Sequence, residues 1–350
     1  MKKNLFYLFA LICSMSFFTA CSDDDDASPA NDISKEYKSE ELHVTSGGEE
    51  ISGGAIKVEA IDNSNVKLTL TNVVNGHASF DMNAAVAQSG SEYTFKGNKD
   101  IDGMKVTVVG TVNGGKAEVE TSAEITSAEI LKSWNFAPAG WLDATLIFNI
   151  ETKDGQINVY DEEGELSESD AKEYSDGIAM MGGSIFSVAF SNDFAFTFNK
   201  NGYVGIKGKS NFSPEGSQDI NIPKLARYYY NPTTKVLTFD APLDGLLAGL
   251  TIANANSALS GTLYVPFICT FREDGKLEAA IDPKFIAPFL PLIPKGEALD
   301  GLLGMLDSVM PAEMADLLPW LKANIKTIAE ALTSDNLKQF TLGCKLAPVK

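Results

Sequence analysis

The side chains that most often perform catalysis are scarce in this chain. Its 350 residues include only two histidines, His43 and His77. Serine and cysteine nucleophiles usually rely on a histidine base, so such a system is excluded from the long stretch after residue 77, and a histidine-rich zinc site is not expected. His43 lies in a polar stretch and His77 follows Gly76 at an expected turn, so we expect both at the surface. We therefore predict no catalytic residue and no metal ligand.

Carboxylates are the remaining acid–base groups, and Asp and Glu together number 47. A pair of them could hydrolyse a glycosidic bond, but none lies in a recognisable motif. Residues 161–165 are as acidic as a calcium loop. An EF-hand, however, needs glycine at its sixth position and glutamate at its twelfth, and the chain has Leu166 and Lys172 there. We expect a solvated acidic loop and predict no cofactor.

The first residues carry the features of a secretory signal, because Lys2 and Lys3 precede an apolar run over residues 5–18 that is too short to span a membrane. Residues 18–21, Phe-Thr-Ala-Cys, resemble the lipobox of bacterial lipoproteins, with Phe18 in place of the usual aliphatic residue. The resemblance implies cleavage after residue 20 and acylation of Cys21, and each buried methylene of such a lipid contributes about 0.8 kcal/mol of anchoring. The alternative is an ordinary cleaved signal followed by a chance cysteine.

The residues after Cys21 are strongly acidic: Ser22, Asp23, Asp24, Asp25 and Asp26. Residues 21–39 can bury little, so we expect a disordered tether. An acidic run after a lipidated cysteine resembles the export signal of Bacteroidetes surface lipoproteins. The resemblance implies an outer-membrane protein that faces the medium, and a periplasmic lipoprotein with a solvated spacer is the alternative.

The net charge of −19 limits the partners that we expect. Nucleic acid and anionic membrane surfaces are bound by clustered Lys and Arg, and no basic stripe is present. We therefore expect contact with a membrane only through the N-terminal lipid, and no nucleic acid.

The composition changes along the chain and indicates two domains, because the length exceeds that of a usual single core. We expect a β-domain over residues 40–130, a linker over 131–141 and a second domain over 142–350. In the first domain apolar and polar residues alternate, as at residues 56–60, 66–70 and 104–112, which predicts an antiparallel meander.

Several stretches of this first domain carry a family resemblance: residues 68–72, 93–97, 106–112 and 115–119. They are similar to the calycin-like β-domains of uncharacterised Bacteroidetes lipoproteins. The resemblance covers about a quarter of the chain, implies a lipocalin-like barrel or half-barrel, and carries no functional residue.

We predict that the second domain has an α+β fold. Alternation predicts strands near residues 142–150, 157–160, 184–190, 194–199, 203–208, 235–239, 261–271, 277–281 and 339–346. Leucine-rich helical stripes fill residues 283–334, so we expect a helical insertion before the last strand. The predicted fold is mainly β, with an N-terminal calycin-like barrel and a β-rich C-terminal domain that carries this insertion.

Two cysteines remain in the second domain, Cys269 and Cys344, and both should face inward from their strands. An oxidising compartment makes a cross-strand disulfide one prediction. Two separate buried thiols are the alternative, since a buried cysteine also serves as a small core residue.

Two features suggest a binding surface. Alternation in a strand should expose at least one ring of Tyr228, Tyr229 and Tyr230, and exposed rings can stack on sugars. The proline-interrupted segment 285–294, with Phe285 and Phe289, should be a buried cover over the sheet or else a site for a hydrophobic ligand or partner.

Three classes of function follow from these observations. The sequence favours a non-enzymatic surface lipoprotein that binds a glycan or a hydrophobic small molecule, because nothing in it demands catalysis. A carboxylate-based glycan hydrolase and a structural or adhesive surface protein with an unidentified protein partner are the alternatives.

Overall fold

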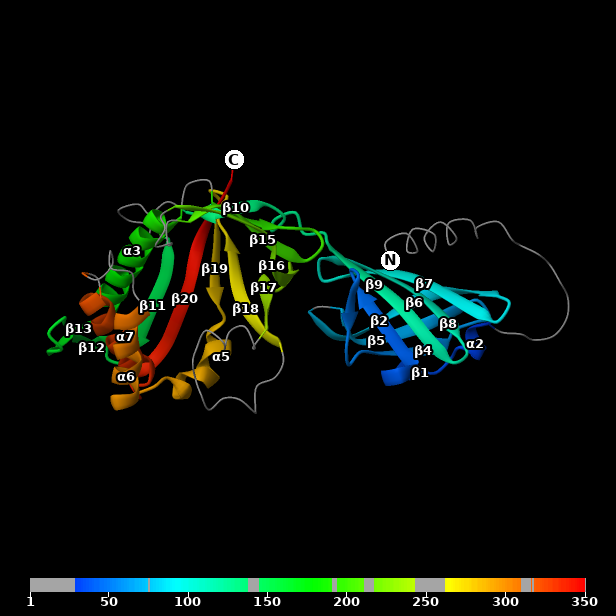
Figure 1. Cartoon of the computed structure of the whole chain (residues 1–350), viewed down its shortest axis with the longest axis horizontal. Coiled ribbons are helices and arrows are strands. Elements are labelled where there is room, and N and C mark those ends of the chain that lie inside the picture. Colours follow the sequence, from blue (N-terminus) through cyan, green and yellow to red (C-terminus); the bar gives the residue numbers. More distant parts are fainter. Residues whose placement is uncertain are drawn as a thin grey trace.

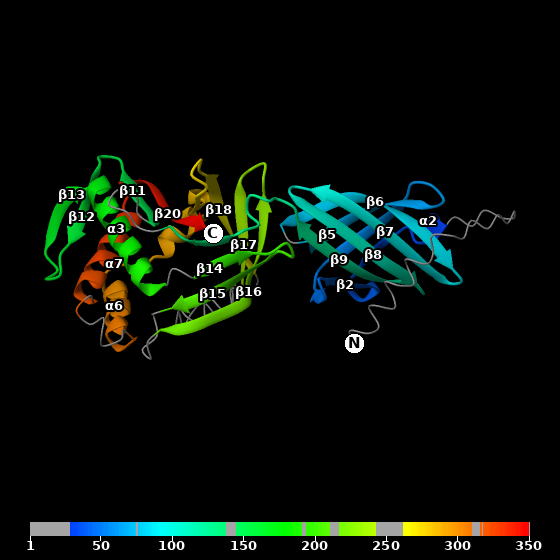
Figure 2. The same cartoon turned by 90° about the horizontal axis from the view of Figure 1, so that it is seen from above.

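The computed structural model describes residues 29–74, 76–137, 145–190, 194–210, 217–242, 262–309, 316 and 318–349. These residues form two β-rich domains that follow one another along the long axis of the molecule (Figure 1). The larger helices gather on the side of the second domain that faces away from the first (Figure 2). The predicted mainly β fold, with an N-terminal β-meander and helices before the last strand, is confirmed.

The N-terminal β-domain is one sheet of nine strands in the order β1-β4-β5-β6-β7-β8-β9-β2-β3. A short helix α2 (Pro29–Asp32) and a 3-10 turn η2 (Ser39–Glu41) accompany it. The strands are β1 (Glu36–Lys38), β2 (Leu42–Ser46), β3 (Glu49–Ile51), β4 (Ala55–Ala60), β5 (Asn65–Val74), β6 (His77–Ser89), β7 (Glu92–Ile101), β8 (Met104–Asn113) and β9 (Lys116–Ile125).

Alternating side chains and tight turns produce this meander. Along β8, buried and more exposed residues alternate from Met104 to Val112. Asp102 and Gly103, at the β7–β8 turn, both have positive φ (46° and 82°), the conformation that two-residue hairpins require. The chain therefore returns directly on itself and the apolar set stays on one face.

The nine-stranded sheet curls around a filled interior. β2 pairs with β9 in parallel, whereas the meander β4–β9 is antiparallel throughout. The Thr121 hydroxyl of β9 donates to the Val73 carbonyl of β5 at 3.3 Å, which joins distant strands. Leu68, Val106 and Val108 are fully buried in the interior.

The second domain is built on another nine-stranded sheet, ordered β10-β14-β15-β16-β17-β18-β19-β20-β11. Its strands are β10 (Ser133–Phe136), β11 (Leu146–Thr152), β14 (Ala195–Phe198), β15 (Tyr203–Ser210), β16 (Gln218–Asn231), β17 (Val236–Pro242), β18 (Thr262–Phe271), β19 (Leu277–Ile281) and β20 (Leu337–Pro348).

Strand β10 closes eight of these strands into a ring. It pairs with β14 on one side and with the end of β20 on the other. Further along β20 its place is taken by β11, which is the last strand of the sheet. We call the ring of β10 and β14–β20 the cup.

A hairpin and five helical segments complete the second domain. They are β12 (Gln156–Tyr160), β13 (Leu166–Asp170), α3 (Ala171–Ala189), α5 (Pro283–Ile286), the 3-10 helix η3 (Ala287–Leu292), α6 (Glu297–Val309) and α7 (Leu318–Leu332). Helices α3 and α7 cover β11 and β20 through a second core that contains Phe148, Ile150, Leu332 and Phe340. The helices thus support one side of the cup.

The two domains share a continuous hydrophobic core. One cluster of buried residues runs from the N-terminal β-domain into Trp134, Tyr230 and Leu277 of the cup. At the interface, the Tyr229 ring lies so close to Gly76 that any Cβ there would overlap it. The Ile125 amide donates to the Lys200 carbonyl at 2.7 Å. The domains are therefore joined by packing as well as by the connecting chain.

Several predicted elements differ from the structure. The expected strand 184–190 lies almost wholly in α3, which starts after Asp170 because that carboxylate accepts from the Lys172 and Glu173 amides, each at 2.9 Å. Part of the expected linker 131–141 is β10, a member of the second sheet. Strand β16 is 14 residues long, although only its tyrosines were recognised in the sequence.

Candidate functional site

The lipidation and export residues proposed from the sequence, Cys21 and residues 22–26, lie outside the described residues. Among the described residues, no helix is both long and apolar enough to cross a bilayer.

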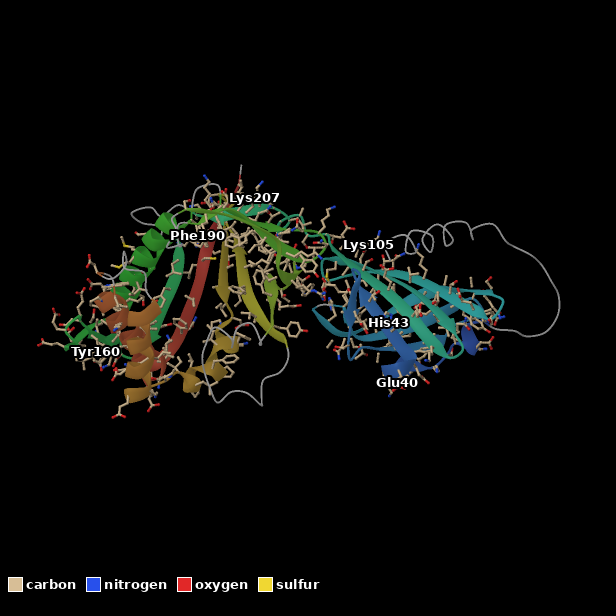
Figure 3. The ribbon with its side chains drawn as sticks, viewed as in Figure 1. Glu40, His43, Lys105, Tyr160, Phe190 and Lys207 are labelled. Atoms are coloured by element: carbon tan, nitrogen blue, oxygen red, sulfur yellow. The ribbon has the colours of Figure 1, made fainter. Side chains whose placement is uncertain are left out.

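The two histidines lie on the N-terminal β-domain and have different environments. His43 on β2 is exposed, and its Nε2 is 3.9 Å from a Glu50 carboxylate oxygen (Figure 3). His77 on β6 is half-buried at the domain interface, where its ring packs edge-on against Phe80 and Tyr229. Burial lowers the pKa of His77, so it is neutral at pH 7. The expectation of a surface position holds for His43 and is wrong for His77.

The three consecutive tyrosines are all buried, contrary to expectation. Tyr228 and Tyr230 point into the cup, while Tyr229 points toward the N-terminal β-domain, whose surface covers it. Their hydroxyls donate to the Asn199 carbonyl at 2.9 Å, the Asp102 carbonyl at 3.3 Å and the Glu129 carboxylate at 2.7 Å, for Tyr228, Tyr229 and Tyr230 respectively. The three rings do alternate between the two faces of the strand, as expected. The outer face that carries Tyr229, however, lies in the domain interface and is not open to solvent.

The predicted disulfide is absent, and both Cys269 and Cys344 are free thiols. In the strand register Cys269 lies opposite Ala279, and Ala279 lies opposite Cys344. Two strand spacings separate the cysteine backbones by about 10 Å, whereas a disulfide needs Cα atoms within about 7 Å. The strand β19 between them therefore prevents the bond, and the alternative of two separate inward thiols is the correct one.

The proline-rich segment is covered on one side only. Ile286, Leu290 and Ile293 pack against the core under the helices. The Phe285 and Phe289 rings contact each other with centroids 5.3 Å apart, and Phe289 is 40% exposed and Leu292 72% exposed. The expected buried cover is thus half correct, since the outer side of the segment remains exposed.

The cup contains the most extensive apolar cavity among those identified around the described residues, with a volume of about 960 Å³. Phenylalanines come from β10, β14, β17 and β18, and aliphatic side chains come from β11, β15, β17, β19 and β20. These lining residues are Phe136, Leu146, Phe196, Phe198, Val204, Leu237, Phe239, Phe267, Ile281, Leu342 and Leu346. Cys344 also lines the cavity.

The inward rows of neighbouring strands produce this lining. Leu237 on β17 lies opposite Phe267 on β18, which in turn lies opposite Ile281 on β19. Residues in register on adjacent strands point to the same face, so successive apolar side chains form a continuous wall. The wall has small members at Ala226 and Ala279, which leave room inside the ring.

A charged cluster borders the cavity near the domain interface. Tyr203, Lys224 and Arg227 line the cavity, and all three contact Glu49 of the N-terminal β-domain. The Arg227 guanidinium forms an ion pair with the Glu49 carboxylate, the Lys224 ammonium lies 3.7 Å from it, and the Tyr203 hydroxyl donates to it at 2.7 Å. This cluster fixes one wall of the cup against the other domain.

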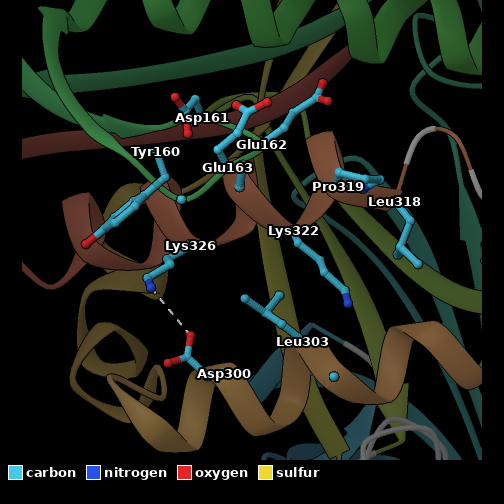
Figure 4. A pocket seen from close by; sticks show the side chains of 13 residues that line it. Tyr160, Asp161, Glu162, Glu163, Asp300, Leu303, Leu318, Pro319, Lys322 and Lys326 are labelled. Atoms are coloured by element: carbon cyan, nitrogen blue, oxygen red, sulfur yellow. Dashed lines mark ion pairs between the residues drawn. The ribbon is translucent and has the colours of Figure 1, made fainter.

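A second hollow lies between the acidic loop and the helices (Figure 4). It has a volume of about 510 Å³ and is lined by both carboxylates and lysines. Asp161 and Glu162 point to one side, whereas Lys322 and Lys326 extend on the other, where Lys326 pairs with Asp300 at 3.5 Å. No three of the described carboxylates at this loop are placed to share a metal ion.

A third cavity of about 780 Å³ lies between the two domains. Its walls are the outer face of β16–β18 and the facing edge of the N-terminal β-domain, including Tyr229, Tyr264 and His77. Polar and apolar groups contribute about equally to its lining, which is therefore much more polar than that of the cup.

Several described carboxyl groups are held in the ionised form. No three His, Cys, Asp or Glu side chains in the described ranges are placed to share a metal ion. Hydrogen bonds from Lys67 and Thr69 lower the pKa of Asp81, and a hydrogen bond from Asn336 lowers that of Asp154. A general acid needs the opposite shift.

The chain matches no protein-family model, and comparisons with curated proteins and with solved structures return no significant match.

The sequence did not predict the cup because its lining comes from nine separate strands. A usable signal was present in the inward set Phe267, Cys269 and Phe271 on β18 and Leu342, Cys344 and Leu346 on β20. That set predicted an apolar face. It could not predict whether side chains from the opposite wall fill the space in front of it.

Proposed function

We propose that this protein is a non-enzymatic binding protein that holds a hydrophobic ligand in the cup. The observation that carries the proposal is the apolar cavity of about 960 Å³, lined by aromatic and aliphatic side chains from most of the strands of the ring. Small-molecule sites are typically concave, mostly apolar and about 300–1,000 Å³ in volume.

The chemistry of the lining favours an extended apolar ligand such as an acyl chain. Most of the lining side chains, such as Phe239 and Leu342, are apolar, and the positively charged lining residues Lys224 and Arg227 are paired with Glu49 at the domain interface. Transfer of each methylene from water contributes about 0.8 kcal/mol, which is about a fourfold gain in affinity. Affinity should therefore rise with chain length until the cavity is full.

The other two classes of function receive less support. A glycan hydrolase would need two carboxyl groups that face each other across a cleft, and Asp240 is the one carboxyl group among the described residues that line the cup. An adhesive role would not account for the apolar cavity, although the exposed Phe289 and Leu292 could contact a protein.

The location that fits this role is the cell surface. We propose that acylation of Cys21 anchors the protein in the outer membrane and that residues 22–26 direct it outward, as the resemblance to surface lipoproteins implies. Ligand capture would then take place outside the cell.

The test is displacement of a fluorescent fatty acid, cis-parinaric acid, by laurate, myristate, palmitate and stearate. We expect saturable binding, with affinity rising by about an order of magnitude for each added pair of methylenes over the shorter acids. A cavity-filling substitution, Ala226→Phe, should abolish most of the binding because Ala226 lies on the cavity wall.

The matched control is Ala85→Phe, which makes the same change at an exposed site on the N-terminal β-domain. It should bind the probe as the unsubstituted protein does. Absence of saturable binding, or equal loss in both variants, would contradict the proposal.

A further inference from the structure

The polar cavity between the two domains is separate in character from the cup. It is formed by Ser46, Glu50 and Asn72 on one side and by Arg227, Thr238 and Tyr264 on the other. In the second domain these residues belong to the outer face of β16, β17 and β18, on the side of the second domain that faces the N-terminal β-domain (Figure 1). Domain interfaces are common positions for binding sites.

The strand register arranges one wall as a continuous row. Arg227 on β16 lies opposite Asp240 on β17, and Asp240 lies opposite Tyr264 on β18. Three neighbouring strands extend the row over about 10 Å. A ligand in this cavity would meet a guanidinium, a carboxylate and a phenol ring in succession.

The cavity carries charged groups of both signs, and Arg227 and Asp240 are already engaged with protein groups. Arg227 forms its ion pair with Glu49, and Glu50 lies 3.9 Å from His43. An ionic ligand would have to displace these partners or face both signs of charge at once. This arrangement disfavours a strongly charged ligand.

The groups available to a ligand are neutral. Asn72, Thr238 and Tyr264 make no side-chain hydrogen bond with any other described residue, and they offer an amide and two hydroxyls. Such groups both donate and accept, as is needed to bind a ligand rich in hydroxyls. Asn72 has a positive φ of 54° at an irregularity of β5 and lines the cavity.

Tyr264 adds an apolar platform. Its side chain is 52% exposed, although large aromatic rings are more often covered. A phenol ring presents a flat apolar face with a polar tip, which suits the C–H face of a sugar ring together with its hydroxyls. Exposed aromatic surface and neutral hydrogen-bonding groups thus occur in the same cavity.

We propose that the interdomain cavity binds a neutral oligosaccharide, with Tyr264 as the stacking platform and Thr238 and Asn72 as hydrogen-bonding groups. This site is distinct from the cup, although Arg227 and Asp240 line both cavities. Because it is made from both domains, occupation by a sugar stabilises their packing through binding to the folded state alone.

The experiment is calorimetric titration of the purified chain with a panel of neutral oligosaccharides: fragments of starch, cellulose, xylan, mannan and galactan. An acidic fragment, oligogalacturonate, serves as the charged comparator. We expect saturable binding of at least one neutral fragment, with little or no binding of the acidic one. Tyr264→Ala should weaken that binding by about tenfold, whereas Tyr264→Trp should retain it. Thr238→Val removes the hydroxyl but keeps a β-branched side chain, and it should also weaken binding.

The control is Ile268→Ala, on the same strand and face as Tyr264, 43% exposed and outside the cavity lining. It should leave affinity unchanged. The proposal is overturned if no neutral fragment binds, if oligogalacturonate binds more tightly than every neutral fragment, or if Tyr264→Ala and Ile268→Ala have the same effect. Fatty-acid binding by the cup is measured on the same variants and should be unaffected, so failure of one proposal is distinguishable from failure of the other.

Discussion

The two thiols of the cup provide a direct test of the strand register. The register Cys269–Ala279–Cys344 places one strand between them, at about 10 Å between cysteine backbones. If it is correct, both thiols remain free even under oxidising conditions, because disulfide geometry cannot span this separation.

The reactivity of these thiols follows from their burial. Burial raises the pKa of Cys344 to about 11 and that of Cys269 to about 12, above the ordinary value of 9.0. Only the thiolate is nucleophilic, so at pH 8 the reactive fraction of Cys344 is about a hundredfold smaller than that of an ordinary thiol. Cys344 is half-buried and lines the cavity, whereas Cys269 is buried, so Cys344 should react first.

The assay is titration with Ellman's reagent, with the order of modification read by mass spectrometry. Cys13 and Cys21 are replaced by serine so that only the two cup thiols remain. We expect slow modification of the folded protein, Cys344 before Cys269, and rapid modification of both after unfolding. Addition of palmitate should slow the reaction of Cys344 further if the cup binds an acyl chain.

Two outcomes would refute this reasoning. A peptide pair joined through Cys269 and Cys344 in the unreduced protein would show that the register or the strand order is wrong. Modification of Cys269 at the rate of a free thiol would show that it is not buried.

Two further predictions concern the N-terminal part of the chain. Gly110→Val should lower the free energy of unfolding by about 1–3 kcal/mol, measured by urea denaturation, because any Cβ at Gly110 overlaps the ring of Phe95, which is 1% exposed and cannot move aside. The control is Gly114→Val, at a turn with open space, where only the positive φ opposes the substitution. A smaller effect at Gly110 than at Gly114 would contradict the contact between Gly110 and Phe95. To test the proposed surface location, protease or antibody is applied to intact cells and should reach the protein. Replacement of Asp23–Asp26 by alanine should make the protein inaccessible to both reagents. If the unaltered protein is already inaccessible, these residues act only as a spacer.

Much of the local structure could be predicted from the sequence. The meander of the N-terminal β-domain follows from period-two alternation, as in β8, and from turn residues such as Asp102 and Gly103. The helical insertion follows from its leucine spacing. The full length of helix α3 was not predicted, although Asp170 and Glu173 form an N-terminal capping signal, because the apolar residues of 184–190 also fit a strand.

The candidate sites could not be predicted in the same way, because each depends on which faces meet. Alternation placed Tyr229 on the face opposite Tyr228 and Tyr230, but Gly76 and His77, far away in the chain, cover that ring. Similarly, two inward cysteines were compatible with a disulfide until the position of β19 was known.

The sequence by itself determined the element types, the inward face of each strand and the scarcity of histidine, since these depend on residue identity and short spacing. Only the tertiary structure decided that eight strands close into a ring, that small residues such as Ala226 and Ala279 leave an apolar cavity inside it, and that the two domains enclose a polar one. The physical reason is that cavities and interfaces arise from contacts between residues distant in the chain, which local periodicity does not specify.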